Sequence, residues 1–322
     1  MERVAEPVTA TPSPLRAKAH YIAFALMVVA LVIAPFVTYP LFVMQALCFA
    51  LFALAFNLLI GYVGLLSFGH ALYFGWASYI SAHAAKVWGF SPELAILTGT
   101  LMGAVCGLIA GSLAIRRQGI YFAMITLALA QMMYFVALRS KFTGGEDGIQ
   151  AVPRGHLFGL IDLNNQNNMY FLVLAIFLGG FLFINRIVQS PFGEVLKAIR
   201  ENEVRAVSLG YKTDRYKLIA FVLSASLAGL AGATKAIVVQ IASLTDVYWP
   251  MSGEVVLMSL VGGLGTIFGP IVGAFVILAM QYKLSVLGEW VLVIQGAIFV
   301  ACVLLFRRGI VGEIANVLKI RL

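Results

Sequence analysis

Two long apolar stretches of this sequence are interrupted by glycine, and polar residues lie at each interruption. The stretches are residues 62–85 and 252–282, and the residues at the interruptions are Ser67, Gly69 and His70 in the first and Gly263, Gly265, Thr266 and Gly269 in the second. A helix that ends inside a membrane leaves backbone N–H and C=O groups unpaired, and such groups bind polar solutes without burying a charged side chain. The chemistry that these residues favour is reversible binding of a small polar molecule.

The two interruptions also resemble each other. Each contains a Phe-Gly pair, Phe68-Gly69 or Phe268-Gly269, with further small residues shortly after it. Paired glycine-broken helices in the two halves of a chain indicate a transport site at mid-membrane depth and predict an inverted repeat. The alternative is that the glycines only allow close helix packing. For His70, a hydrogen bond to a freed backbone carbonyl competes with contact to a bound solute.

A charged segment, residues 190–217, lies between two apolar runs and is too charged to cross a bilayer. Ser190 suits a helix N-cap, Pro191 suits the first helical position and Gly210 suits a helix end. Five residues recur at helical spacing, namely Val195, Ile199, Asn202, Ala206 and Leu209. The segment is predicted to form one or two short helices that lie against another surface.

The composition places most of the chain in lipid. Hydrophobic residues make up 61% of the 322 residues and charged residues only 11%, whereas an ordinary soluble domain has about 25% charged residues. The net charge of +8 is typical of basic cytoplasmic loops. No basic and aromatic cluster lies on a soluble segment, so nucleic-acid binding is not expected.

Apolar windows of about 20 residues predict membrane spans near residues 20–39, 41–60, 93–115, 119–138, 168–186, 216–240 and 284–306. If residues 62–85 cross once and residues 252–282 dip in and back, most Lys and Arg residues share one side, which is then cytoplasmic. The expected fold is an all-α polytopic membrane protein with about eight spanning helices plus glycine-broken or re-entrant helices.

The expected domain organisation has three parts. Residues 1–19 form a disordered cytoplasmic tail, because this proline-containing stretch has too few apolar residues to fold alone. Residues 20–306 form the membrane domain and include the charged segment. Residues 307–322 form a cytoplasmic amphipathic segment.

Several features are expected to serve structure alone. Gly99, Gly103, Gly107 and Gly111 recur every four residues and predict a helix-packing face. The three cysteines lie inside apolar runs without the spacing of metal ligands. Lys235 is expected to extend along its helix to the outer surface.

Two kinds of machinery are missing from the sequence. No G-x-x-x-x-G-K-[ST] motif is present, so the chain has no such phosphate cradle for ATP. No acidic residue is predicted at mid-membrane depth, where ion-coupled carriers usually place ionisable groups. The charged segment 190–217 and the absence of mid-depth acidic residues disfavour an autonomous secondary carrier or channel and a membrane-embedded enzyme or assembly factor.

Taken together, these features resemble the LivM-type permease family, the membrane subunits of bacterial ATP-driven importers for branched-chain amino acids. The resemblance covers roughly residues 40 to 310 and is carried by residues 64–71 (GLLSFGHA), 143–148 (TGGEDG) and 262–270 (GGLGTIFGP). Glu203, Ala206 and Gly210 are similar to positions of the family's cytoplasmic coupling loop, with Arg205 where alanine is often found.

The resemblance implies a multi-pass protein of the bacterial inner membrane that works in a complex. Its partners would be a second related permease, two ATP-binding cassette subunits and a soluble binding protein outside. The chain itself would be neither an enzyme nor the holder of a cofactor, because the partner subunits bind and hydrolyse ATP. Branched-chain amino acids are the expected substrates, and urea, amides, other amino acids or aromatic acids are the alternatives.

Two groups of residues are expected to meet these partners. The coupling contact with the ATPase is expected at Arg200, Glu201, Glu203, Ala206 and Gly210. The basic residues expected to dock the binding protein are Arg139, Lys141 and Arg154, which flank the turn at residues 143–148. A solvated loop with ordinary charges is the alternative for this second group.

Overall fold

The computed structural model describes residues 14–284, 288, 290, 293–294, 296–297, 300 and 309–317. The helices are α1 (Pro14–Val37), α2 (Pro40–Asn57), the π-helix η1 (Leu58–Val63), α3 (His70–Lys86), α4 (Pro92–Ala114), α5 (Ile120–Arg139), α6 (Gln166–Val188), α7 (Pro191–Glu201), α8 (Glu203–Ser208), α9 (Thr213–Val239), the 3-10 helix η2 (Leu244–Asp246), α10 (Trp249–Gly262), α11 (Gly269–Leu284) and α13 (Gly309–Val317). The strands are β1 (Ile149–Gln150), β2 (His156–Leu157), β3 (Ile161–Asp162) and β4 (Ile241–Ala242). The predicted all-α architecture is confirmed, because each strand has only two residues.

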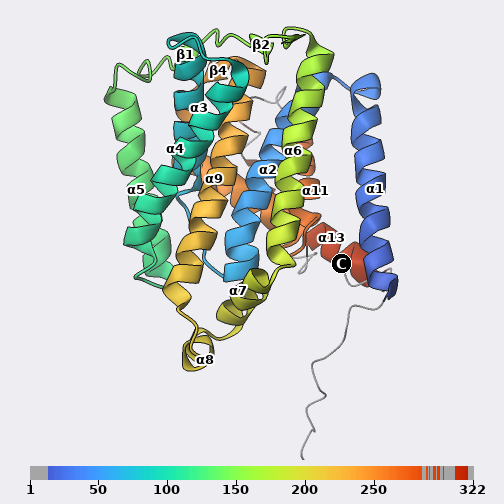
Figure 1. Ribbon diagram of the computed structural model, residues 1–322, viewed down its shortest axis with the longest axis vertical. Coiled ribbons are helices and arrows are strands. Elements are labelled where there is room, and N and C mark those ends of the chain that lie inside the picture. Colours follow the sequence, from blue (N-terminus) through green and yellow to red (C-terminus); the bar gives the residue numbers. More distant parts are fainter. Residues whose placement is uncertain are drawn as a thin grey trace, which may run out of the picture.

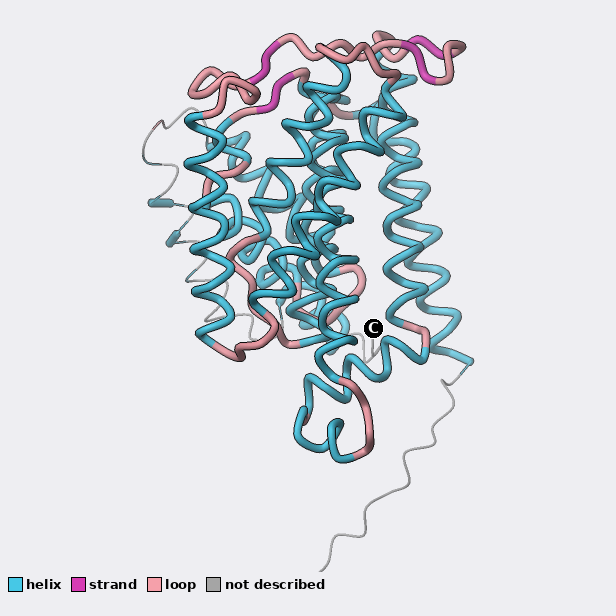
Figure 2. Tube along the Cα trace, turned by 60° about the vertical axis from the view of Figure 1, so that its left-hand side comes forward, coloured by secondary structure: helices cyan, strands magenta, loops and turns pink. Residues whose placement is uncertain are grey.

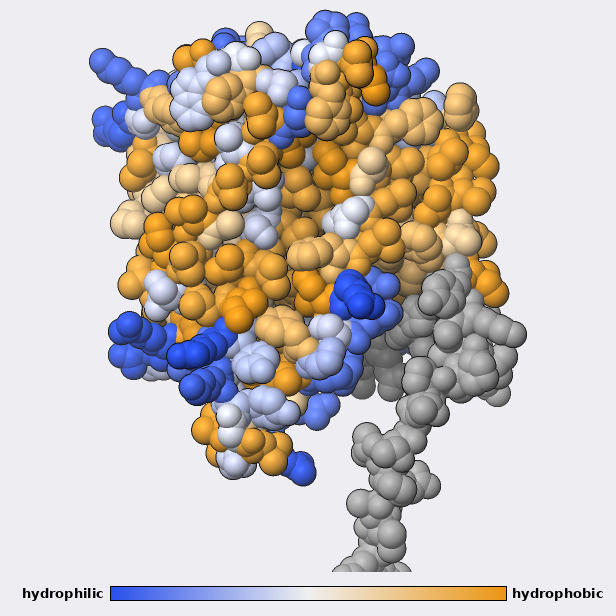
Figure 3. Space-filling view, viewed as in Figure 1, coloured by the Kyte–Doolittle hydropathy of each residue, from blue (hydrophilic) through white to orange (hydrophobic). Residues whose placement is uncertain are grey.

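Five helices in the described ranges are long and apolar enough to cross a membrane: the continuous α2–η1 unit, α4, α5, α6 and α9. Two shorter apolar helices, Ile22–Val37 and α11, accompany them. Figure 1 shows these helices as one bundle, and Figure 3 shows an apolar belt between two more polar ends. The chain is therefore a multi-pass membrane protein.

The two ends of the bundle carry different structures. One end, called the inner end here, carries α7 and α8, which lie at the bottom of Figure 1. The opposite, outer end carries the strands. There β1 pairs with β4 and β2 pairs with β3, both antiparallel. Figure 2 shows loops and strands covering the outer end and the short helices projecting from the inner end.

Helix α9 lies at the centre and packs closely on α4 through the predicted glycine face. A Cβ atom at Gly103 would lie 2.8 Å from the Ala225 carbonyl oxygen and 2.9 Å from the Gly229 Cα. A Cβ atom at Gly99 would lie 2.7 Å from the Ala233 Cβ. The predicted packing role of this glycine stripe is confirmed, because any side chain there would push the two helices apart.

The first glycine interruption begins later than the sequence predicted. Helix α2 continues through η1 to Val63, residues 64–69 form the break, and α3 then runs back to the outer end. The predicted division into a span at 41–60 and a broken helix at 62–85 is therefore wrong in its boundary. The π-helical turn and the left-handed Gly64, with φ +82°, extend the first span by one turn before the chain reverses.

The second interruption forms the expected re-entrant pair. The Tyr248 ring, just before α10, lies 5.0 Å from the Tyr134 ring of α5, and the Tyr282 ring of α11 lies 5.6 Å from the Phe42 ring of α2. Both helices thus have one end at the outer end of the bundle. The two broken motifs run in the same direction, from the outer end to the break and back.

Some predicted boundaries fall at the limits of the structure. Helix α1 begins at Pro14, so the helix includes residues that were expected in the tail, and residues 1–13 lie outside the described residues. The apolar run 284–306 also lies mostly outside them, as do Cys302 and parts of segment 307–322. Within the described ranges Cys48 and Cys106 are buried and free, as expected of small core residues.

Candidate functional site

Helices α7 and α8, together called the inner arm, form a bent pair at the inner end (Figure 1). Ser190 caps α7 by accepting a hydrogen bond from the Gly193 N–H at 3.4 Å. Asn202 leaves the helical conformation, with φ −158° and ψ 99°, and caps α8 by accepting from the Arg205 N–H at 3.0 Å. The charged segment therefore forms two helices, which was one of the two alternatives that the sequence left open.

One face of α7 is attached to the rest of the protein. Leu196 and Ile199 are buried, and a Cβ atom at Gly193 would lie 2.7 Å from the Ile187 carbonyl oxygen. The bend at Asn202 then redirects the predicted helical stripe, so that Leu209 is 68% exposed. The stripe is thus buried on α7 but does not continue as one face along the whole arm.

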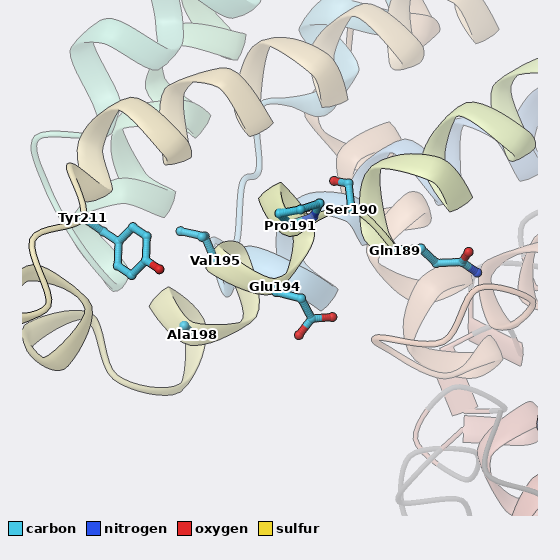
Figure 4. Close-up of a pocket in the computed structure, with 7 residues that line it drawn as sticks. All are labelled: Gln189, Ser190, Pro191, Glu194, Val195, Ala198 and Tyr211. Atoms are coloured by element: carbon cyan, nitrogen blue, oxygen red, sulfur yellow. The ribbon is translucent and has the colours of Figure 1, made fainter. Parts of the chain in front are cut away.

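The other side of α7 holds a shallow groove. Its lining residues are Gln189, Ser190, Pro191, Glu194, Val195, Ala198 and Tyr211. In Figure 4 the Tyr211 ring lies next to Val195, and the Glu194 carboxylate points away from them. Lys197 pairs with this carboxylate at 2.8 Å. An apolar floor with an ion pair at its edge suits contact with a protein surface.

Helix α8 faces in two directions. Ala206 is buried, and Glu203 forms an ion pair with Lys217 of α9 while it accepts a hydrogen bond from the Gln118 side chain at 2.8 Å. Val204 of α8 and Leu209 directly after this helix are 81% and 68% exposed. Glu203 and Ala206 therefore hold the arm onto the bundle, whereas the exposed apolar residues are the ones free to meet a partner.

Gly210 closes the arm with a left-handed turn. Its φ is +88°, and the Tyr211 N–H then donates to the Ala206 carbonyl at 3.2 Å. A Cβ atom at Gly210 would meet nothing within 4 Å. The glycine is therefore required for the backbone conformation and not for close packing. Glu201 is exposed, and the Arg200 side chain turns inward to the Gly61 carbonyl.

The side chains of the first break are enclosed by the bundle. Ser67 and His70 are both fully buried. The His70 Nε2 and Ser224 Oγ atoms are 2.9 Å apart, and the rings of Phe56 and Tyr73 lie 5.0 and 5.6 Å from the imidazole. The Nε2 atom of His70 thus pairs with a hydroxyl group of α9. Neither side chain is exposed at the surface of this chain, and Gly69 is buried beside them.

The Asn57 side chain of α2 connects the second break to the α2–η1 helix. The buried Asn57 side chain accepts a hydrogen bond from the Gly265 N–H at 3.0 Å and donates one to the Thr266 carbonyl at 2.9 Å. The Thr266 hydroxyl in turn donates to the Gly263 carbonyl at 2.8 Å and accepts from the Gly269 N–H at 3.1 Å. These bonds connect the second break to α2, the helix that leads into the first break.

Backbone donors at the first break also have partners. The Phe68 N–H donates to Thr126 Oγ1 at 3.2 Å, and the Ala71 N–H donates to Ser252 Oγ at 2.9 Å. The expectation that such groups stay unpaired for a solute is wrong for these donors. In an apolar environment an unpaired backbone group is costly, and hydroxyl and amide side chains satisfy it here.

The basic residues at the outer end differ in their roles. Arg139 and Lys141 are exposed, as docking residues would be. Arg154 instead donates from Nη2 to the Val238 carbonyl at 2.7 Å, near the C-terminus of α9. Its charge is placed to satisfy a helix end. This intramolecular role makes Arg154 a poor candidate for a freely available docking charge.

The predicted position of the Lys235 side chain at the outer surface is wrong. Its Nζ atom lies 2.8 and 2.7 Å from the two carboxylate oxygens of Asp246, and both residues are buried. Lys235 therefore does not extend to the outer surface. Asn57 and Lys217 were not predicted to have a role, although each is a polar residue in or beside a predicted span. Among the described residues, no group of His, Cys, Asp and Glu side chains could hold a metal ion.

Comparison with known proteins gives a consistent set of matches. The profile of the family described as branched-chain amino acid transport system / permease component matches residues 38–303. The high-affinity branched-chain amino acid transport system permease protein LivM of Escherichia coli (strain K12) is 25% identical over 296 residues, which cover 85% of this chain and 70% of that protein. No solved structure matches the chain significantly.

Two further relatives share this similarity. The probable branched-chain amino acid transport permease protein LivH of Methanocaldococcus jannaschii is 27% identical over 261 residues, covering 73% of this chain and 79% of that protein. The ribose import permease protein RbsC of Bacillus subtilis (strain 168) is 28% identical over 242 residues, covering 68% of this chain and 70% of that protein.

Proposed function

The chain belongs to the family of branched-chain amino acid transport system permease components, and from this we propose that it forms half of the translocation pathway of an ATP-driven importer. The proposed substrates are branched-chain amino acids, and the proposed location is a bacterial inner membrane. The family match over residues 38–303 is the observation that carries the proposal. The LivM and LivH names of the relatives supply the substrate class.

The inner arm supports coupling to an ATPase. It projects beyond the spanning helices, as Figure 2 shows, and it presents both the groove on α7 and the exposed apolar residues of α8. Closure and opening of two ATPase subunits would move this arm and so switch the pathway between outward-facing and inward-facing states. The chain would supply no catalytic residue and hold no cofactor of its own.

The proposed complex contains four further subunits besides this chain: a second permease, two ATP-binding cassette subunits and an external binding protein. The face towards the second permease would complete the pathway. In this proposal Ser67 and His70, which are buried, support the residues that line the pathway and do not contact the solute themselves. Selectivity would then rest mainly on the binding protein.

The substrate class needs its own test, because a ribose import permease is similar over 68% of this chain. A shared permease fold therefore serves chemically different solutes. Urea, amides, other amino acids and aromatic acids remain the alternative substrates for this importer class.

Reconstitution tests the proposal. The complete complex in proteoliposomes is expected to take up radiolabelled leucine, isoleucine and valine only with both ATP inside and binding protein outside. A complex with a hydrolysis-deficient ATPase subunit is the control and is expected to show none. Uptake driven by an ion gradient without ATP would contradict the proposed mechanism, and uptake of urea but not leucine would contradict the substrate class.

A further inference from the structure

Arg200 lies in the last turn of α7 but does not point away from the protein. Its guanidinium donates a hydrogen bond to the Gly61 carbonyl in η1. Its Cγ atom would be 3.1 Å from a Cβ atom at Gly64, and its Nη1 atom would be 3.3 Å from one at Gly265. One side chain of the inner arm therefore touches both glycine breaks.

The absence of side chains at the glycines allows Arg200 and the backbones of the two breaks to come this close. A Cβ atom at Gly61 would lie 2.8 Å from the Gly265 backbone nitrogen, so the two backbones are nearly in contact. Gly64 and Gly265 also have φ values of +82° and +74°, which other residues rarely adopt. Asn57 then ties the same turn to α2 through its hydrogen bonds to Gly265 and Thr266. We call Asn57, Gly61, Gly64, Arg200, Gly265 and Thr266 the glycine junction.

The π-helix explains why a carbonyl is available to Arg200. A π-helical turn at the end of a helix changes the usual hydrogen-bond pattern, and terminal carbonyls have no partner within the helix. In η1 the Leu59 carbonyl accepts from the N–H groups of both Gly64 and Leu65. The Gly61 carbonyl is left to accept from Arg200. Within the described residues Arg200 forms no ion pair with a carboxylate, so this contact can break without leaving an unpaired acid.

From this geometry we propose that Arg200 is a positioning residue that passes a displacement of the inner arm to both breaks at once. The proposal rests on the proposed function, because the ATPase subunits are what would displace the arm. When α7 moves, Arg200 would pull on η1 directly and on the turn at residues 263–268 through the shared backbone contact and Asn57. The guanidinium is thus an internal link of the permease and not an ATPase contact.

The decisive variant is Arg200→Met, which keeps a long side chain but removes every hydrogen-bond donor. The residue is exposed overall, so this change is not expected to unfold the protein. Arg116→Met is the matched control, because Arg116 is an exposed arginine in the α4–α5 loop outside the junction. Arg200→Lys keeps a cation and is expected to recover part of the wild-type behaviour.

Motion of the turn is measured with a cysteine at the partly buried Leu264, in a background without the three native cysteines. In the reconstituted complex, its rate of reaction with a small polar thiol reagent is compared between the nucleotide-free and ATP-trapped states. The wild-type and Arg116→Met proteins are expected to show a nucleotide-dependent change in this rate. Arg200→Met is expected to lose that change and to take up at least tenfold less substrate per ATP hydrolysed.

The outcomes separate the two proposals. If Arg200→Met keeps both the nucleotide-dependent labelling and normal uptake per ATP, the link through Arg200 is overturned. If Arg200→Met and Arg200→Lys are impaired equally in assembly, Arg200 is a structural residue and the proposal is also overturned. A wild-type complex without any ATP-dependent uptake would instead overturn the proposed function.

Discussion

Helix α9 carries a buried lysine near each of its ends, and the two lysines are held in different ways. At the outer end Lys235 meets both carboxylate oxygens of Asp246, and the two side chains are only 10% and 3% exposed. At the inner end Lys217 pairs with Glu203, whose side chain is 23% exposed. The outer pair is enclosed by protein, whereas the inner pair lies beside an arm that reaches beyond the bundle.

The surroundings of the outer pair are also more tightly packed than those of the inner pair. The outer pair holds a loop that is tightly packed, since a Cβ atom at Gly75 would lie 2.7 Å from the Val247 backbone nitrogen. The inner pair holds α8, a helix of six residues with strongly exposed apolar side chains. We therefore expect α9 to be held firmly at its outer end and less firmly at its inner end, where a partner would act.

The largest expected effect is on the outer pair. Asp246→Asn leaves the Lys235 charge buried without a carboxylate and is expected to cost about 3–5 kcal/mol of stability. Thermal unfolding of the detergent-purified protein would measure this loss. The double variant Lys235→Met with Asp246→Asn is expected to recover much of it. Equal stability of Asp246→Asn and wild-type protein would contradict the fixed outer end.

The second-largest loss of stability is expected from a substitution in the glycine junction. Gly61→Ala forces a Cβ atom against the Gly265 backbone and is expected to cost roughly 1–3 kcal/mol. Because it separates the two breaks, uptake per ATP should fall more than protein yield does. Gly253→Ala is the matched control, since a Cβ atom there would meet nothing within 4 Å. Similar uptake by both variants would show that the close approach has no functional part.

A smaller effect on stability is expected at the inner pair. Combining Glu203→Gln with Gly210→Ala weakens the Lys217 contact and strains the left-handed turn, at a cost of roughly 1–2 kcal/mol. The arm would then be loosely held, so ATP hydrolysis should continue while uptake falls. Parallel assays of phosphate release and leucine uptake would measure this separation. Normal uptake at a normal ATPase rate would contradict the proposed role of the arm.

The smallest effect is expected from the exposed charges of the outer end. Neutralising Arg139 and Lys141 to glutamine should leave folding and maximal uptake unchanged. It should slow association of the binding protein, and more so at low salt, because rim charges act mainly on encounter rates. Stopped-flow association kinetics would test this. Arg154→Gln should instead lower stability, since Arg154 serves the end of α9.

The sequence predicted those parts of the fold that depend on local pattern. Long apolar runs gave the spans, and the four-residue glycine repeat gave the α4–α9 contact. The charge of residues 190–217 predicted that they stay outside the membrane, and α7 and α8 indeed project from one end of the bundle. Ser190 and Gly210 marked the ends of the inner arm, because their roles need only the residues next to them.

The sequence did not predict contacts that depend on distant neighbours. Asn57 and Gly265 meet across 208 positions, and His70 meets Ser224 across 154. Lys235 appeared to lie on an open helix end, because its pairing with Asp246 requires the chain to reverse through β4 and η2. The direction of Arg200 depends on where η1 ends. Each of these partners follows from the packing of separate helices and not from a local motif.

Hydrogen exchange of the whole complex shows whether the inner arm moves together with the second break while the outer end of α9 stays fixed, because one experiment reports on all three regions. Exchange would be compared between the nucleotide-free and ATP-trapped states of the reconstituted importer. Our account predicts that amides of the inner arm and of residues 263–268 change together, while those of residues 240–248 at the outer end stay protected. A change in the inner arm without any change at residues 263–268, or an equal change at residues 240–248, would contradict it.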